Sequence, residues 1–186
     1  VRAVDAAASG MGGLDIVVNS AAIMAEGTLE STAGADFLRM LEVNVGGVFN
    51  VCKAAAPLLR AAGKAGAGAA IVNIASDLGV RPIPGRIAYC PSKAAVIMLT
   101  RCVALELAPY VRANTILPGL VETPMIRHRF EESADPAALR RAMEELYPLR
   151  RLGSTDDMAA AAVYLACAES AFMTGSELSV CGGSLI

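Results

Sequence analysis

The sequence of 186 residues contains no tryptophan and only one histidine, and its longest stretch without a charged residue has twelve residues. A membrane-spanning helix needs about 18 or more apolar residues in a row, so no membrane span is predicted. The five cysteines are odd in number and never spaced as Cys-x-x-Cys, which argues against disulfides and a zinc site and favours a reducing, cytoplasmic compartment. The net charge of −2 gives no support for nucleic-acid binding, and no metal is expected.

What the sequence does contain is an alternation of short aliphatic runs with longer helical patterns. Runs rich in valine and isoleucine without strict alternation are typical of parallel strands covered on both faces. Strands are predicted at 14–21, 69–76, 111–119 and 176–180, and long helices at 35–62 and 86–108. Further helices are predicted to begin after Asp135, which Pro136 follows, and at Ser154, whose spacing to Asp157 fits a capping box. The pattern indicates one α/β domain over 1–186, with a doubly wound parallel sheet between two helical layers.

The segment AYCPSK at 88–93 places Tyr89 and Lys93 four residues apart, in a chain with four tyrosines and three lysines. In a helix these two positions lie on one face. An ammonium group near a phenol favours the phenolate and lowers a pKa that is ordinarily about 10. Tyr89 is therefore a candidate for giving or taking a proton near neutral pH.

Three further residues are expected at the same edge of the sheet. Ser76 ends a predicted buried strand, where α/β folds place their ligands. Asn44 precedes two glycines inside the first long helix, which predicts a kink. Thr123 follows the third strand and can offer a hydroxyl to a ligand. Each also has a structural reading, since Ser76 could simply end a strand, Asn44 could be a surface residue and Thr123 could belong to an ordinary turn.

In this order and spacing, the motifs resemble those of the short-chain dehydrogenase/reductase family. The family's Asn–Ser–Tyr–Lys tetrad matches Asn44, Ser76, Tyr89 and Lys93. Its Asn-Asn-Ala-Gly stretch matches Asn19, Ser20, Ala21 and Ala22, and its Pro-Gly-x-Val-x-Thr motif matches Pro118, Gly119, Val121 and Thr123. Its closing Asp-Gly-Gly matches Cys181, Gly182 and Gly183. The resemblance covers about the C-terminal two-thirds of the family's domain, and it implies the C-terminal strands of a Rossmann-like sheet.

The resemblance also implies a reaction. An NAD(P)-dependent oxidoreductase (EC 1.1.1.-) would interconvert a secondary alcohol and a ketone, with the hydride carried by the cofactor. Ser76 would hydrogen-bond the substrate oxygen, Tyr89 would transfer the proton, and Lys93 would lower the Tyr89 pKa and hold the nicotinamide ribose. Asn44 would fix a water that links Lys93 to solvent. Residues 118–123 would contact the nicotinamide, and residues 19–22 would run beside the ribose and adenosine, although Asn19 could also bond within the sheet.

The sequence has no Gly-x-Gly-x-x-Gly turn, with which this family ordinarily binds the pyrophosphate. The first fifteen residues are instead similar to the helix before the family's fourth strand, so about 60 residues or more, at ~30 per strand–helix unit, are expected to be missing at the N-terminus. The choice between NAD and NADP is then not readable, and 14–21 would form an unpaired apolar edge. We therefore expect the fragment by itself to be inactive. The alternative is a truncated, non-catalytic α/β interaction module or pseudoenzyme.

Two features bear on partners and substrate. The resemblance implies a homodimer or homotetramer formed through helices 35–62 and 86–108, and the second of these is apolar on most faces, as suits a helix between a sheet and a second subunit. The substrate, a small alcohol or ketone, is expected in a pocket between 77–86 and 124–148. Apolar residues in both segments, Leu78, Ile83, Pro84, Met125 and Ile126, favour an apolar or small substrate over a sugar phosphate.

Overall fold

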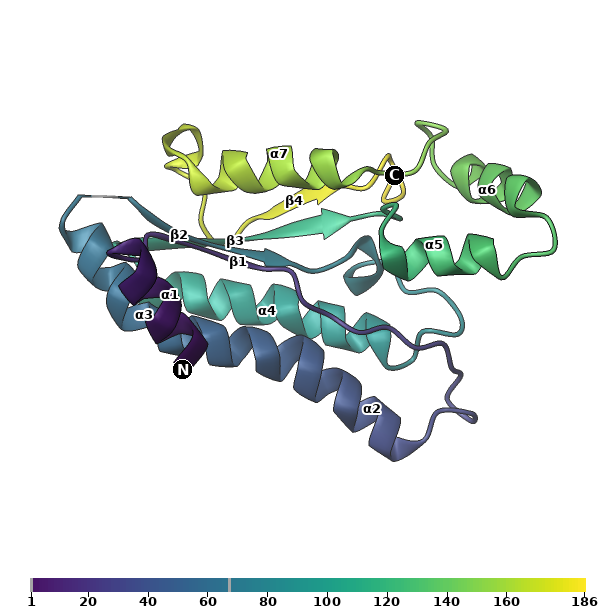
Figure 1. Ribbon diagram of the computed structural model, residues 1–186, viewed down its shortest axis with the longest axis horizontal. Helices are drawn as coiled ribbons and strands as arrows, with labels where there is room; N and C mark the ends of the chain where they lie inside the picture. Colours follow the sequence, from purple (N-terminus) through teal and green to yellow (C-terminus); the bar gives the residue numbers. More distant parts are fainter. Residues whose placement is uncertain (1, 67) are drawn as a thin grey trace.

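The computed structural model describes residues 2–66 and 68–186, in which four short strands form one parallel sheet (Figure 1). The strands are β1 (Ile16–Asn19), β2 (Ala69–Ile74), β3 (Val111–Pro118) and β4 (Glu177–Val180). They lie side by side in the order β1-β2-β3-β4, with Val17 paired to Ile71 and Ile71 to Ala113. The predicted parallel α/β sheet is confirmed, and its strands lie within the predicted segments.

Helices cover the sheet on two sides (Figure 1). The helices are α1 (Arg2–Met11), α2 (Gly34–Leu41), α3 (Gly47–Lys64), α4 (Tyr89–Leu107), α5 (Pro124–Glu131), α6 (Pro136–Glu145) and α7 (Thr155–Ala166). One core lies between the sheet and α3 and α4, where Leu59, Ile71 and Val96 are fully buried. A second core joins α7 to the opposite face through Leu165 and Ile116. The predicted three-layer arrangement is therefore confirmed.

The edge strand β1 departs from the prediction that every strand is covered on both faces. Val17 is 8% exposed, whereas its neighbours Ile16 and Val18 are 44% and 48% exposed. Successive side chains of a strand point to opposite faces. Val17 therefore packs into the core on the side of α3, and the other face of β1 is uncovered among the described residues. The other prediction for this segment, an apolar sheet edge, is confirmed by the strand order.

The first long helix is interrupted where a kink is predicted. Between α2 and α3 the chain makes a π-helical turn over Glu42–Gly46, with Asn44 at its centre. Short π-helical turns inside α-helices occur often at functional sites. The second long helix, predicted at 86–108, begins later, at Tyr89. Pro91 then stands in the first turn, where its missing N–H costs no intrahelical hydrogen bond.

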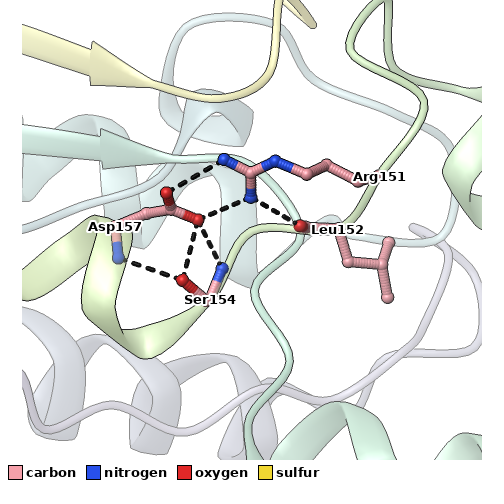
Figure 2. A network of polar contacts seen from close by, with 4 residues as sticks. All are labelled: Arg151, Leu152, Ser154 and Asp157. Atoms are coloured by element: carbon pink, nitrogen blue, oxygen red, sulfur yellow. Dashed lines mark hydrogen bonds and ion pairs between the residues drawn. The ribbon is translucent and has the colours of Figure 1, made fainter.

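The N-terminus of α7 shows how local sequence sets a helix boundary (Figure 2). The Asp157 backbone N–H donates to Ser154 Oγ at 3.1 Å, and the Ser154 N–H donates to Asp157 Oδ2 at 2.7 Å, which is the predicted capping box. Arg151 donates to both Asp157 oxygens at 2.6 and 2.9 Å, and this guanidinium holds the Asp157 pKa below its usual range. At the N-terminus of α6, the side chain of Asp135 accepts from the Ala138 N–H at 2.9 Å. Across the described ranges, none of the helices combines the length and the apolar character that crossing a membrane requires.

Candidate active site

Tyr89 and Lys93 meet at the carboxyl end of β2. Tyr89 is the first residue of α4, and Lys93 follows one turn later, with its Nζ 5.7 Å from the centre of the Tyr89 ring. The Lys93 amine donates a hydrogen bond of 3.0 Å to the carbonyl oxygen of Ile74, the last residue of β2. Lys93 is 3% exposed. The helix therefore places both side chains on one face, as their spacing predicts, and directs that face towards the end of a buried strand.

Ser76 completes the group, two residues after β2. Its hydroxyl lies next to the Tyr89 phenol, and it is 7% exposed. Its Oγ accepts from the Leu78 N–H at 3.1 Å and donates to Asp77 Oδ1 at 3.1 Å. Ser76, Tyr89 and Lys93 thus come together in the structure.

The prediction that Tyr89 is acidified is wrong for the chain by itself. Burial raises the pKa of the Tyr89 phenol, and the smaller opposing effect of the Ser76 hydroxyl does not reverse it. The nearby Asp77 and Cys90 raise this pKa further, whereas Arg86 lowers it. Removing a phenol from water disfavours its charged form. Tyr89 is therefore a protonated phenol at neutral pH, which suits a proton donor.

The same burial acts on Lys93 in the opposite direction. Desolvation lowers the pKa of the Lys93 ammonium to about 8, because the charged form is the one that loses hydration. An ammonium group has three N–H donors. Among the described residues, one of these donors is used, in the bond to Ile74.

Asn44 lies at the centre of the π-helical turn and is 1% exposed. Its Oδ1 accepts from the Ile23 N–H at 2.8 Å, and its Nδ2 donates to the Ile23 carbonyl and to Ser92 Oγ, both at 3.0 Å. Ser92 in turn donates to the Tyr89 carbonyl at 2.7 Å. Asn44 thus joins the segment after β1 to the first turn of α4. One lone pair of its Oδ1 is left for the predicted water.

The residues predicted to line the cofactor fall into two groups. Asn19 donates to Asn73 Oδ1 at 2.8 Å, so its side chain bonds within the sheet, as its structural reading predicts. Ala21 is exposed and Ala22 half-buried in the segment that follows β1.

The second group is the turn from Pro118 to Thr123, which leaves β3 at its carboxyl end. Here the Leu120 N–H donates to the Tyr147 hydroxyl at 2.8 Å. Val121 pairs with Gly153, and Thr123 precedes α5. Gly119 packs so tightly that a Cβ would lie 2.9 Å from the Tyr147 ring, which explains the glycine at this position.

Two pockets lie near these segments. One of about 500 Å³ is lined by Gly119, Leu120, Tyr147 and the Cys181–Gly183 turn, among others. The other, of about 520 Å³, is lined mainly by the loop at 78–87 and by Leu29 and Cys90. Of the two segments predicted to form one substrate pocket, 77–86 lines the second of these pockets, and 124–148 contributes Tyr147 to the first.

The described residues fit a nicotinamide cofactor at Lys93. A buried amine with two unused N–H donors, at the carboxyl end of a parallel strand, matches a ligand that carries vicinal hydroxyl groups. Within the described ranges, no three histidine, cysteine, aspartate or glutamate side chains lie close enough together to hold a metal ion. The Nε2 atom of the single histidine, His128 on α5, lies 3.2 Å from Oε1 of Glu132.

Comparison with known proteins identifies the family of this chain. The family model described as enoyl-(acyl carrier protein) reductase matches residues 1–184. The chain belongs to the short-chain dehydrogenase/reductase family. It is 38% identical to an uncharacterized oxidoreductase of Thermotoga maritima, over 93% of this chain and 68% of that relative. The chain spans 64% to 66% of the length of three other relatives, which are an uncharacterized oxidoreductase of Mycobacterium tuberculosis, a trans-4-hydroxycyclohexanecarboxylate dehydrogenase of Sinomonas cyclohexanicum and a 3beta-hydroxysteroid dehydrogenase of Eggerthella lenta.

Solved short-chain dehydrogenase/reductase structures superpose closely on the chain. An NAD⁺-bound xylitol dehydrogenase matches 98% of this chain and 73% of its own, with a TM-score of 0.87 and 32% identity. ElxO with NADP bound matches 99% of this chain and 72% of its own, with a TM-score of 0.88 and 30% identity. These matches confirm the Rossmann-like fold, and members of the family bind either dinucleotide.

Three polar residues at the site are absent from the predicted catalytic and cofactor-binding residues. Ser92, fully buried, connects Asn44 to Tyr89, and Asp77 and Ser184 bond to one another beside Ser76. Ser92 could have been suspected from its position three residues after Tyr89, on the same side of the helix. Ser184 gives no such signal, because its partner is 107 residues away.

Proposed function

We propose that the protein containing this chain is an NAD(P)-dependent oxidoreductase that interconverts a secondary alcohol and a ketone. The observation that carries this proposal is the meeting of the Ser76 hydroxyl, the Tyr89 phenol and the Lys93 amine at the carboxyl end of β2. A phenol and a hydroxyl side by side can both donate to one ketone oxygen.

Each residue has a role in the reduction direction. Ser76 orients the ketone by donating to its oxygen. Tyr89, whose pKa is raised by burial, gives its proton to that oxygen as negative charge develops there. Lys93 holds the ribose hydroxyls with its two remaining N–H groups and stabilises the phenolate that Tyr89 leaves behind. When bound, the cofactor supplies the hydride.

The remaining residues position these groups. Asn44, through Ser92, fixes the first turn of α4, and with it the direction of the Tyr89 side chain. Residues 118–123, with Pro118, Gly119, Val121 and Thr123, would contact the nicotinamide. Ala21 and Ala22 would line the ribose and adenosine side, and Asn19 would support them from within the sheet.

The proposed activity is tested on the protein encoded by the complete reading frame that contains these 186 residues. We expect it to bind NADH or NADPH, seen as a change in nicotinamide fluorescence, and to oxidise one of them in the presence of a ketone. A panel of small apolar ketones, sugars, steroids and acyl thioesters is run with both cofactors. A protein that binds neither cofactor would support the alternative, a non-catalytic interaction module. The 186-residue chain, assayed in parallel, tests whether it is active by itself.

We also propose that the chain forms a homodimer or homotetramer through α3 and α4. Apolar side chains are exposed along these helices: Phe49 of α3 is 46% exposed, and Met98 and Leu105 of α4 are 54% and 83% exposed. Met98 and Leu105 are seven residues apart and so lie on one helical face.

The Leu105→Glu substitution tests this association. We expect it to shift the sedimentation coefficient from that of an oligomer to that of a monomer, because burying an unpaired carboxylate between subunits is strongly unfavourable. Leu146→Glu, at a residue that is 71% exposed and lies outside these helices, is the matched control. A wild-type protein that sediments as a monomer at all concentrations would contradict the proposal.

A further inference from the structure

A buried carboxyl group connects Ser76 to the C-terminal turn of the chain. The Ser76 hydroxyl donates to Asp77 Oδ1 at 3.1 Å, and the Ser184 hydroxyl donates to Asp77 Oδ2 at 2.5 Å. Asp77 and Ser184 are each 5% exposed. Both oxygens of this carboxylate are therefore satisfied by hydroxyl groups away from bulk water.

The two glycines before Ser184 direct it towards Asp77. Gly182 and Gly183 have φ values of 60° and 92°, in the left-handed region that favours glycine, and the Ser184 N–H closes the turn by donating to the Cys181 carbonyl at 3.1 Å. A Cβ on Gly183 would lie 2.7 Å from the Pro148 ring. Figure 1 shows the C-terminus beside the carboxyl ends of β3 and β4. The turn thus brings a hydroxyl from the end of the chain into the region of Ser76.

The Ser76 hydroxyl has a single proton, and Asp77 and a substrate oxygen would compete for it. A hydroxyl has one proton and two lone pairs. The Leu78 N–H points to one lone pair, and the proton points to Asp77. A substrate oxygen under the proposed function needs that same proton, which rotation about the Cβ–Oγ bond can deliver without moving the oxygen atom.

This rotation removes one donor from Asp77. A buried carboxylate that loses a hydrogen bond is destabilised, and a hydrogen bond to a charged group is stronger than one between neutral groups. Ser184 continues to donate to the other oxygen throughout. Without Ser184, Asp77 would depend on Ser76 alone, and the Ser76 proton would be harder to release.

We propose that Asp77 and Ser184 are positioning residues of this site, which hold the Ser76 oxygen in place and allow its proton to turn from Asp77 to a substrate oxygen. The inference rests on the proposed function, because it assigns Ser76 to the substrate. It assigns a role in the site to the turn at 181–184, which lies outside the family tetrad.

The first test is a kinetic double-mutant cycle on the complete protein. Ser184→Ala is expected to lower kcat/KM about tenfold when Asp77 is present, since one hydrogen bond to a charged group is lost. In the Asp77→Asn background the same substitution is expected to cost less than about threefold, because a neutral amide needs no second donor. Equal losses in both backgrounds would show a merely structural effect and overturn the inference.

Two further variants make the cycle specific. Ser184→Thr keeps the hydroxyl and therefore the hydrogen bond to Asp77. We expect its kcat/KM to lie within about twofold of the wild-type value. Ser9→Ala, at an exposed serine of α1, is expected to change nothing. A Ser184→Thr protein as impaired as Ser184→Ala would contradict the role of the hydroxyl.

The second test needs no turnover and uses the 186-residue chain. Around Tyr89 lie Asp77, Cys90, Arg86 and Lys93, and around Asp77 lie Tyr89 and Tyr147. The Asp77 carboxylate accepts from the Ser76 hydroxyl, which lies beside the Tyr89 phenol, so its negative charge acts on Tyr89; Asp77→Asn should therefore lower the Tyr89 pKa, measured by carbon NMR of ring-labelled tyrosine. A Tyr89 pKa that does not move would overturn the inference. Because this readout is independent of cofactor and substrate, it separates a failed inference from a failed proposed function.

Discussion

Replacing Tyr89 with phenylalanine in the complete protein is expected to lower kcat for ketone reduction by about 10²- to 10⁴-fold, the range that a positioned general acid contributes. Phenylalanine keeps the ring that lies beside the Lys93 amine and removes only the hydroxyl proton. Affinity for NADH or NADPH should change little. The measurement is steady-state oxidation of the reduced cofactor, together with a fluorescence titration of cofactor binding.

A matched control for this experiment is Tyr110→Phe. Tyr110 is 42% exposed and precedes β3, at the end of the sheet opposite to Ser76. Its substitution should leave kcat unchanged. Turnover of the Tyr89→Phe protein at the wild-type rate would show that the proton comes from another group, and the proposed role of Tyr89 would be wrong.

Replacing Lys93 with methionine is expected to stabilise the cofactor-free chain while weakening cofactor binding. Burial lowers the Lys93 pKa from 10.5 to about 8, so folding at pH 7 carries the full cost of burying an ammonium group. Methionine has a similar length and no charge. We expect the free energy of unfolding at pH 7 to rise by about 2 kcal/mol, less than the pKa change alone implies, because the bond to the Ile74 carbonyl is lost.

The pH dependence of this gain has a definite sign. Between pH 8 and 10.5 the unfolded chain binds more protons at Lys93 than the folded chain, so wild-type stability rises with pH in this window. The advantage of Lys93→Met should therefore be greatest below about pH 8 and should shrink towards pH 10.5. Urea unfolding at several pH values measures it, with Lys53→Met, at an exposed lysine of α3, as the control.

In the complete protein the same substitution should lower both affinity and turnover. Losing charge-assisted hydrogen bonds to the ribose is expected to weaken NADH or NADPH binding about tenfold or more. A stable but impaired variant is the pattern expected where a functional group is kept at a cost to stability. Full cofactor affinity in Lys93→Met would contradict the proposed ribose contact.

These two residues also show where sequence reasoning succeeds. The face shared by Tyr89 and Lys93 follows from four-residue spacing in a helix, which is a local property. The position of Ser76 follows from its place after an aliphatic strand, because parallel strands end at one edge of the sheet. The interruption at Asn44 was predictable from the two glycines after it, which are poor helix formers.

The pKa directions were not predictable in this way. The sequence shows that Lys93 is near Tyr89 but not how much water reaches either group. Burial by the surrounding layers decides both shifts, and it raises the pKa of the phenol where proximity to an ammonium group predicts a decrease. Desolvation depends on every atom packed around a group, so it belongs to the tertiary structure.

The sequence by itself determined the parallel α/β class, the family and the helix face that Tyr89 and Lys93 share, because periodicity and motif spacing depend on residues that are close together in the chain. Only the tertiary structure decided that β1 is covered on one face, that Ser92 links Asn44 to Tyr89, and that Ser184 meets Asp77 across 107 residues. Contacts of this kind form where segments that are distant in the sequence pack together, so no local sequence pattern predicts them.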